Sequence, residues 1–264
     1  MRLLQISDCH LTNSSGDDSE IVKAKTKRKT AAFLRESSGV PQTTYLQEAL
    51  DLAENYDALI LTGDIADSPT QANLQLLSTM LEGHRYLYTF GNHDYYSYTS
   101  SCSSPEDRDR YLDEFLRFLP CDPVMDSLQV GGVNLVALDD SLAQFSEMQL
   151  AFLRAELAKG LPILLFLHLP IYSSSFVEKA YECWDSSMAV GTPIEVLAAH
   201  GETDPKMQAT EATRRVLELI QKEPLIRGIF ASHLHFEDEA IVLGKPQFIS
   251  KPCYLGNVRG IEVR

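Results

Sequence analysis

Short apolar runs alternate with stretches of helical periodicity along most of the chain. The apolar runs predict buried strands at 3–7, 58–61, 86–90, 163–167 and 226–231, and a hairpin over 128–138 around Gly131-Gly132. Apolar positions that recur every three or four residues predict helices at about 44–54, 69–81, 105–118, 146–159 and 210–222. Strands that alternate with helices in this way predict an α/β fold.

Polar residues at the expected helix starts support these assignments. A hydroxyl side chain before a proline, or three residues before a glutamine, is typical of a first helical turn because it caps free backbone N–H groups. The chain has four such starts: Ser68-Pro69, Ser104-Pro105, Thr44 with Gln47, and Ser146 with Gln149.

Two polar stretches interrupt the alternation. Residues 12–42 are charged and rich in Ser and Gly, and residues 172–207 are irregular and contain Gly191 and Pro193. We interpret both as loop insertions within a single domain that spans residues 1–264. The first insertion contains a basic segment, 23–29, which could contact a phosphate but is better explained as a solvated surface.

Composition narrows the classes of partner. The 264 residues are 44% hydrophobic and 23% charged, as in ordinary globular proteins, and the formal net charge is −14. Duplex binding needs a basic face, so we expect no nucleic-acid partner. No apolar run reaches the length of a membrane span, and the N-terminus lacks the pattern of a signal peptide. We therefore expect no membrane partner and a cytoplasmic location.

The cysteines do not form a recognisable pattern. There are five, they are scattered, and no C-x-x-C pair occurs, so neither a thiolate zinc site nor a disulfide framework is expected. We interpret them as reduced thiols. Cys9 lies between two candidate metal ligands, but in extended backbone its side chain would point away from theirs.

Five short polar motifs follow segments that are expected to be strands. They are Asp8-Cys9-His10, Gly63-Asp64-Ile65-Ala66-Asp67, Gly91-Asn92-His93-Asp94, His168, and His233-Leu234-His235. Open α/β sheets bind ligands at the carboxyl ends of their strands, so we expect the five motifs to meet at one edge. Imidazole nitrogen combined with carboxylate or amide oxygen suits divalent Mn, Fe or Zn.

Seven side chains of these motifs are candidate metal ligands: Asp8, His10, Asp64, Asn92, His168, His233 and His235. Asp8 and His10 are two residues apart, so in extended backbone both face the same side. Asp64 follows a glycine, which permits close approach of the backbone, and its two oxygens can bridge two cations. Taken singly, each residue has a simpler role in a turn or as an ordinary polar side chain. Their order after successive strands favours a site for two metal ions.

The motif order D-x-H, G-D-x-x-D, G-N-H-D, H and H-x-H resembles the calcineurin-like metallophosphoesterase superfamily. Within it, the chain is most similar to class III cyclic-nucleotide phosphodiesterases and glycerophosphodiesterases. The motifs extend from Asp8 to His235, nearly the whole chain. This resemblance implies a four-layer sandwich of two mixed β-sheets flanked by helices, with a dimetal site at the carboxyl ends of the strands.

The resemblance also implies roles for the motif residues. It puts one metal on Asp8, His10, Asp64 and His235, and a second metal on Asp64, Asn92, His168 and His233. His93 would face the substrate, and Asp67 would orient it.

Two positions depart from patterns in the superfamily. Ser232 stands where the family usually has a glycine before the final H-x-H. A side chain at this position could alter the local backbone geometry, but it does not change the set of ligands. Protein serine/threonine phosphatases of the superfamily have Arg before the Gly and Glu after the His of the third motif. This chain has Phe90 and Asp94 at those positions, which counts against a phosphoprotein phosphatase.

These assignments predict a hydrolase of small phosphodiesters, of the cyclic-nucleotide or glycerophosphodiester type. A hydroxide that bridges the two cations would attack phosphorus in line, and His93 would protonate the leaving oxygen. Tyr95 and Tyr96 follow His93 and are candidate substrate contacts. Three aromatic side chains of the second insertion either wall the site or pack in the core: Tyr172, Tyr181 and Trp184.

Other functions stay open at this point. They are a phosphomonoesterase, a pyrophosphate-bond hydrolase, and a metal-binding scaffold without catalysis. The expected partner is a small phosphoester. The sequence does not decide the metal or the oligomeric state.

Overall fold

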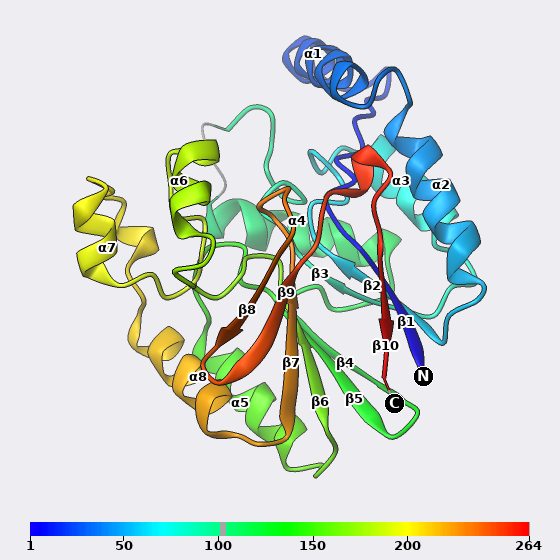
Figure 1. The fold of residues 1–264 in the computed structure, drawn as a ribbon. Helices are drawn as coiled ribbons and strands as arrows, with labels where there is room; N and C mark the ends of the chain where they lie inside the picture. Colours follow the sequence, from blue (N-terminus) through cyan, green and yellow to red (C-terminus); the bar gives the residue numbers. More distant parts are fainter. Residues whose placement is uncertain (101–103, 264) are drawn as a thin grey trace.

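The computed structural model describes residues 1–100 and 104–263, which form two mixed β-sheets (Figure 1). The first sheet has the strand order β10-β1-β2-β3. Its strands are β1 (Arg2–Ile6), β2 (Ala58–Thr62), β3 (Tyr86–Thr89) and β10 (Arg259–Glu262). The first three are parallel, and β10 pairs antiparallel with β1.

The second sheet has the strand order β4-β5-β6-β7-β9-β8. Its strands are β4 (Met125–Val130), β5 (Val133–Leu138), β6 (Ile163–Phe166), β7 (Ile226–Ala231), β8 (Asp238–Val242) and β9 (Lys245–Ile249). The four central strands are parallel, and antiparallel hairpins close both edges. The hairpin expected around Gly131-Gly132 is confirmed as β4 and β5, with both glycines at positive φ.

Helices cover the outer face of each sheet. Helices α2 (Gln42–Ala53), α3 (Gln71–Met80) and α4 (Pro105–Phe118) pack on the first sheet, and α5 (Glu147–Leu157) and α8 (Glu211–Lys222) pack on the second. A third apolar cluster joins the inner faces of the two sheets, for example through Leu3, Ile60, Leu135 and Phe166. The α/β class and the four-layer sandwich are therefore confirmed.

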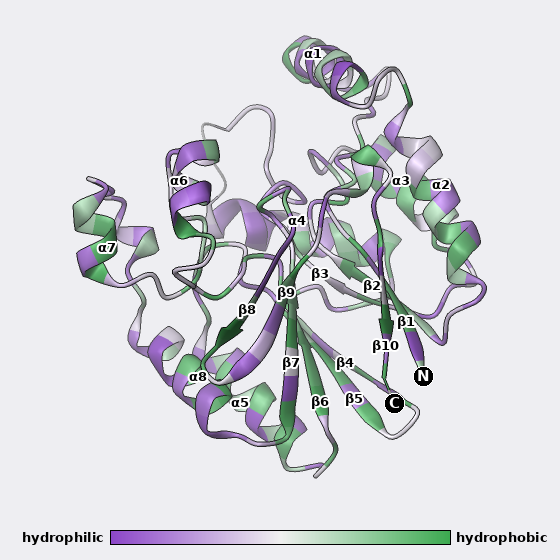
Figure 2. Cartoon of the chain, in the orientation of Figure 1, coloured by the Kyte–Doolittle hydropathy of each residue, from purple (hydrophilic) through white to green (hydrophobic). Residues whose placement is uncertain are grey.

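The layered arrangement explains the continuous apolar runs. Strands β2, β5 and β6 are buried along their whole length because one face meets the other sheet and the opposite face meets helices. These strands are mostly green in Figure 2. In the described part of the chain, no helix is both long and apolar enough to cross a membrane.

Two of the four expected helix starts are confirmed. Ser104 caps α4 by accepting from the backbone N–H of Asp107, and Ser146 forms a full capping box with Gln149 at the start of α5. The other two are wrong. Helix α3 starts later than expected, capped by Thr70.

Helix α2 starts earlier than expected and has no side-chain cap. It follows Pro41, and its first residue, Gln42, turns inward so that its Nε2 donates to the carbonyl of His10. A tertiary hydrogen bond therefore fixes this helix start, and local capping chemistry could not show it.

The expectation that both insertions are loops is wrong for much of their length, because both contain helices. Residues 12–42 contain α1 (Glu20–Glu36), which buries only Thr26 and Phe33 and so lacks the apolar stripe that predicts a helix. Residues 172–207 contain α6 (Val177–Trp184), α7 (Ile194–Ala199) and the 3-10 turn η1 (Pro205–Met207). These helices are too short for a clear periodic pattern. A second 3-10 turn, η2 (Cys253–Leu255), precedes β10.

The four described cysteines are unpaired, and Cys102 lies outside the described residues. Cys9 is fully buried in the apolar cluster between the first sheet and its helices. Burial raises the pKa of its thiol well above the usual range, so the group stays protonated.

Candidate metal centre

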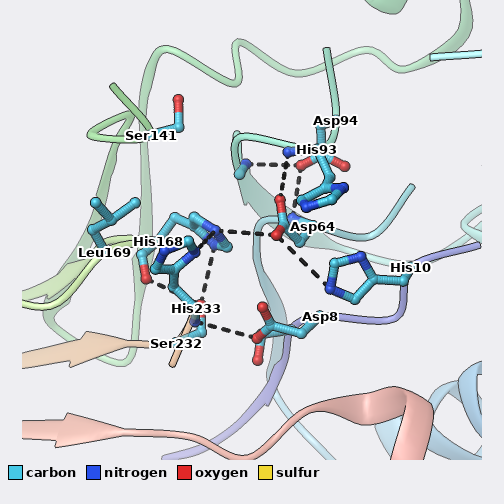
Figure 3. A network of polar contacts seen from close by, with 12 residues as sticks. Asp8, His10, Asp64, His93, Asp94, Ser141, His168, Leu169, Ser232 and His233 are labelled. Carbon is cyan, nitrogen blue, oxygen red and sulfur yellow. Dashed lines mark hydrogen bonds and ion pairs between the residues drawn. The ribbon is translucent and has the colours of Figure 1, made fainter. Parts of the chain in front are cut away.

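The loops that carry the five motifs converge at the carboxyl ends of the strands of both sheets (Figure 3). The loops after β1 and β2 stay paired, because the backbone N–H of Asp8 donates to Gly63 O at 3.0 Å and that of His10 to Asp64 O at 2.9 Å. The loops after β6 and β7 are joined in the same way, from Ser232 N to His168 O at 2.9 Å. Parallel pairing thus continues past the strand ends and aligns the motifs.

Five of the seven candidate ligands have left-handed backbone. The φ angles are 50° at Asp8, 49° at His10, 52° at Asp64, 69° at His233 and 59° at His235. The extended backbone expected for Asp8 and His10 is therefore wrong, since β1 ends at Ile6. For residues other than glycine this conformation costs roughly 1 kcal/mol or more, and such strain gathers at functional sites.

Asp8, His10 and His235 form one cluster of potential ligand atoms. Nε2 of His10 lies 3.2 Å from Nε2 of His235, which in turn lies 3.5 Å from Asp8 Oδ1. Asp64 Oδ2 is 3.8 Å from His10 Nε2, on the far side of the cluster.

Asp64, His168 and His233 form a second cluster. Nε2 of His168 lies 3.4 Å from Asp64 Oδ2 and 3.0 Å from His233 Nδ1. Asn92 lines a cavity of about 160 Å³ together with His233. Asp64 Oδ2 is therefore next to both clusters, and Figure 3 shows this side chain between His10 and His168.

These atoms fit divalent cations. Two ligands about 2.1 Å from a shared cation, at angles of roughly 90–110°, are about 3.0–3.4 Å apart, which matches the distances between facing ring nitrogens. Asp8 Oδ1 is buried and accepts no hydrogen bond from the described residues. A buried carboxylate oxygen without a donor is costly unless a cation or a protonated group faces it.

The outer ring nitrogens of two histidines have acceptors that fix their tautomers. His168 Nδ1 lies 2.8 Å from the carbonyl oxygen of Thr62, which can only accept, and His10 Nδ1 lies 2.9 Å from Asp67 Oδ1. Both outer nitrogens therefore carry a proton, and each Nε2 is the nitrogen that would give its lone pair to a bound cation.

The other two histidines have weaker outer partners. His233 Nε2 lies 3.3 Å from the Sδ atom of Met188, and His235 Nδ1 lies 3.5 Å from the hydroxyl oxygen of Tyr254. Their inner nitrogens are Nδ1 of His233 and Nε2 of His235. All four imidazoles thus turn one nitrogen to the centre and one away from it.

Ser232 fits the site although the family usually has glycine there. Its hydroxyl donates to Thr62 O at 2.7 Å and lies 3.3 Å from His168 Nδ1. The side chain is fully buried and supports the same carbonyl that orients His168. This departure therefore leaves the ligand geometry intact.

Neighbouring charges and burial shift the pKa values of three of these side chains. Burial alone would raise the pKa of Asp64, but His168 and His93 outweigh it and hold the pKa well below its usual value. Burial would lower the pKa of His168, but Asp64 raises it to about 10. Burial and the charge on His168 lower the pKa of His233 to about 3. A proton on His168 therefore occupies the position where a cation would compensate Asp64.

His93 and Asp67 lie together beside the first cluster. His93 Nδ1 is 3.1 Å from Asp67 Oδ1, and the backbone N–H of His93 donates to Asp64 Oδ1 at 2.8 Å. The His93 side chain is 23% exposed, whereas Asp67 is fully buried. Asp67 Oδ1 also meets His10, so one carboxylate contacts both a candidate ligand and the candidate acid.

Asp94 is a positioning residue for which sequence reasoning gave no role. Its two oxygens accept from the backbone N–H groups of Asp64 and Ala66 at 2.9 Å and of Gly91 at 2.8 Å, and from the hydroxyl of Tyr88 at 2.9 Å. It ties the loop after β2 to the loop after β3. Its place directly after Gly91-Asn92-His93 was the available signal.

Asp140 was also missed. Its Oδ1 accepts from the backbone N–H groups of His168 at 2.9 Å and Leu169 at 3.0 Å, so it holds the loop that carries His168. Asp140 lies two residues after the apolar run 128–138, as the recognised motifs lie close behind their own strands. That position was a signal in the sequence.

The two candidate substrate contacts differ. Tyr95 is fully buried, packs on Phe90, and has its hydroxyl 2.9 Å from Ser141 Oγ, so it cannot contact a substrate here and that expectation is wrong. Tyr96 is partly buried, and its ring centroid is 5.8 Å from that of His93. Aromatic neighbours fill the space around Tyr95, which the sequence pattern could not show.

Of the side chains of Tyr172, Tyr181 and Trp184, only that of Trp184 reaches the centre. Its ring centroid lies 5.2 Å from that of His235. Tyr181 stacks on His200, and Tyr172 packs against an apolar cluster.

Solved structures share this fold. A dimetal phosphatase from Danio rerio superposes with a TM-score of 0.55 at 12% identity, covering 96% of this chain and 88% of that one. A purple acid phosphatase from seeds of yellow lupin (Lupinus luteus) gives 0.54 at 12% identity, covering 97% and 44%. At such low identity the likeness concerns the fold alone.

Sequence comparison gives a closer grouping. A cAMP/cGMP dual specificity phosphodiesterase of Mycobacterium tuberculosis (strain CDC 1551 / Oshkosh) is 27% identical over 212 residues, which cover 75% of this chain. The match covers 55% of that relative, so the chain spans about half its length. The profile of the calcineurin-like phosphoesterase family matches residues 1–237, which include all five motifs. The chain therefore belongs to the calcineurin-like phosphoesterase family.

Proposed function

We propose that this chain is a metal-dependent hydrolase of small phosphodiesters, of the cyclic-nucleotide or glycerophosphodiester type. The observation that carries the proposal is that two clusters of ligand atoms adjoin Asp64 Oδ2, with His93 beside them. The relative named as a cAMP/cGMP phosphodiesterase supports the choice of diesters.

Two divalent ions, Mn, Fe or Zn, are proposed as cofactors. Asp8, His10 and His235 would hold one, His168, His233 and Asn92 the other, and Asp64 would bridge them. When bound, such ions activate water and neutralise charge on the phosphoryl oxygens.

His93 is proposed as the proton donor to the leaving oxygen, with Asp67 as its partner. Burial alone would lower the pKa of His93, but Asp64 and Asp67 outweigh it and raise the pKa above the ordinary value. The raised pKa favours the protonated ring, which can release its proton when the P–O bond breaks. Its partial exposure leaves room for a substrate on that side.

The cavity beside Asn92 suits a small organic group. Its wall includes the apolar side chains of Leu142, Leu169 and Met188 and opens onto His233. A volume of about 160 Å³ is below the usual range of roughly 300–1,000 Å³ for drug-sized ligands, which favours a small substituent on phosphorus.

The test combines metal analysis with a substrate panel. The purified protein should contain up to two transition-metal ions and, with added Mn²⁺, should hydrolyse diesters better than matched monoesters. His93→Ala should keep its metal and lose turnover by roughly 10²-fold or more. Metal binding without turnover of any ester would overturn the proposal in favour of a scaffold. A preference for monoesters or pyrophosphates would overturn the assignment of diesters as the substrate class.

Two further expectations stay proposals. The apolar cluster between the sheets supports a single domain over residues 1–264. The four unpaired cysteines favour a cytoplasmic location.

A further inference from the structure

Helix α1 lies at the end of the molecule where β1 leads into the metal centre (Figure 1). Lys25, Lys29 and Phe33 are spaced by four residues, so they share one face of this helix. Phe33 stacks on the ring of His10, with 5.1 Å between ring centroids and 21° between planes. This face of α1 therefore borders the candidate ligands.

Lys29 reaches the proposed proton donor. Its Nζ lies 3.6 Å from Asp67 Oδ1, the same oxygen that meets His93, and 5.7 Å from the centroid of the Phe33 ring. The Lys29 side chain is 30% exposed, so its ammonium group is open to solvent and to a ligand.

Lys25 places a second ammonium group farther out on the same side. Its Nζ donates to the hydroxyl of Tyr96 at 2.7 Å and to the carbonyl of Tyr98 at 3.4 Å, and lies 4.7 Å from the centroid of the Tyr96 ring. The ring of Tyr96 in turn borders His93. Each lysine is therefore one side chain away from His93, Lys29 through Asp67 and Lys25 through Tyr96.

The arrangement calls for an anion. Ordering a lysine side chain costs up to about 2 kcal/mol of rotamer entropy, and two ammonium groups held on one helix face repel each other. Asp67, the carboxylate at Lys29, is already shared with two histidines. The chain as a whole is acidic, with a net charge of −14, so this pair of ammonium groups is opposite in sign to the overall charge.

We propose that Lys25 and Lys29 bind a second anionic group of the substrate, a phosphate or a carboxylate carried by the leaving alcohol. This rests on the proposed function and narrows its substrate class. Hydrolysis adds a water oxygen to phosphorus and breaks the P–O bond, and the leaving oxygen takes its proton from His93. An anion on the leaving alcohol would therefore extend from His93 toward α1, while the other substituent on phosphorus faces the Asn92 cavity.

Matched substrates isolate this interaction. Methyl 4-nitrophenyl phosphate and methyl 3-carboxy-4-nitrophenyl phosphate have the same phosphorus centre and differ by one carboxylate on the leaving group. Both are assayed with Mn²⁺ on the full chain and on Lys29→Met, Lys25→Met and Lys27→Met. Lys27 is exposed on the other face of α1, and methionine keeps helix propensity, so Lys27→Met is the matched control.

The full chain should favour the carboxylated ester by about 10-fold in kcat/KM, mainly through KM. Lys29→Met should abolish the preference, Lys25→Met should reduce it, and Lys27→Met should retain it. An unchanged preference in both Lys29→Met and Lys25→Met would overturn the inference. An equal loss on both esters in Lys29→Met would also overturn it, because Lys29 would then act through Asp67.

A binding measurement separates this inference from the proposed function. In the corresponding benzyl phosphonates a methylene replaces the scissile oxygen, so calorimetry reports binding without turnover. If neither the full chain nor any of the three variants hydrolyses either ester, the proposed function fails. Tighter binding of the carboxylated phosphonate that depends on Lys29 would then still support the anion site, and equal binding of both phosphonates would overturn it.

Discussion

Gly91 packs closely against Asp64 in the metal centre, and an added methyl group at Gly91 tests this contact. A Cβ added at Gly91 would lie 2.8 Å from Asp64 Cγ and closer still to the backbone nitrogen of Asp64, whereas real Cβ contacts essentially never fall below 3.0 Å. Asp64 cannot swing aside, because its Oδ1 accepts from the backbone N–H of His93 and its own N–H donates to Asp94. Gly91→Ala must therefore move the loop after β2, the loop after β3, or both.

The expected cost follows from this geometry. Overpacking a rigid interior by a methyl group costs about 1–3 kcal/mol, and the obstacles here are backbone and a tethered carboxylate, so we expect about 3 kcal/mol. For a chain of this length, each kcal/mol lowers the melting temperature by roughly 2–4 °C, which gives about 6–12 °C. Moving Asp64 Oδ2 should also weaken both metal sites together, because both adjoin that atom.

Gly16→Ala is the matched control, because a Cβ at Gly16 would meet nothing within 4 Å. Calorimetric melting in EDTA measures the steric cost without metal, and titration with Mn²⁺ then measures the sites. Gly16→Ala should resemble the unmodified chain in both assays. If Gly91→Ala melts within about 2 °C of it and binds Mn²⁺ equally well, the close approach of the two loops is not a constraint on the centre.

Three further predictions concern single side chains. Asp67 raises the pKa of His93, so Asp67→Asn should move the alkaline limb of the pH–rate profile to lower pH; an unmoved limb would count against His93 as the acid. Trp184 is the only tryptophan and borders His235, so Mn²⁺ bound at His235 should quench the tryptophan fluorescence and EDTA should restore it. Unchanged emission at saturating Mn²⁺ would contradict the proposal that an ion binds at His235. Burial raises the pKa of Asp140 from 3.8 to about 7, so its stabilising contribution is full below about pH 4 and is lost as the pH rises through 7. In EDTA, the fall in melting temperature between pH 5 and 8 should be smaller in Asp140→Asn, and an equal fall would refute this assignment.

Most of the buried strands and the longer core helices could be predicted because their sequence signals are local. Each buried strand needs apolar side chains on both faces, and this requirement appears directly as a short apolar run such as 163–167. The packing of two sheets against each other has no local signal, and it was predicted only from the resemblance to a family. The start of α2 shows the limit, since Gln42 is fixed by a hydrogen bond to His10, a residue 32 positions away.

The candidate ligands were predictable for a similar reason. Parallel strands end at one edge, so polar residues after successive apolar runs must meet there. The backbone conformation that aims them was not predictable, because aspartate and histidine adopt positive φ more often than most residues but still in a small minority of cases. The same applies to Asp94 and Asp140, whose carboxylates bind backbone N–H groups on other loops.

Helix α1 shows why a helix that contributes to a functional site can be missed when helices are predicted from the pattern of buried apolar residues. A helix with only Thr26 and Phe33 buried contributes little to the core, so its sequence carries almost no apolar signal. Its ordered contacts are instead directed at the metal centre, through Phe33 on His10 and Lys29 on Asp67. Helices are usually stabilised by packing of an apolar face, and α1 has little of one. A role at the site accounts for Lys25 and Lys29 on the face that borders the ligands, and the Lys29→Met and Lys27→Met variants distinguish that role from a solvated surface.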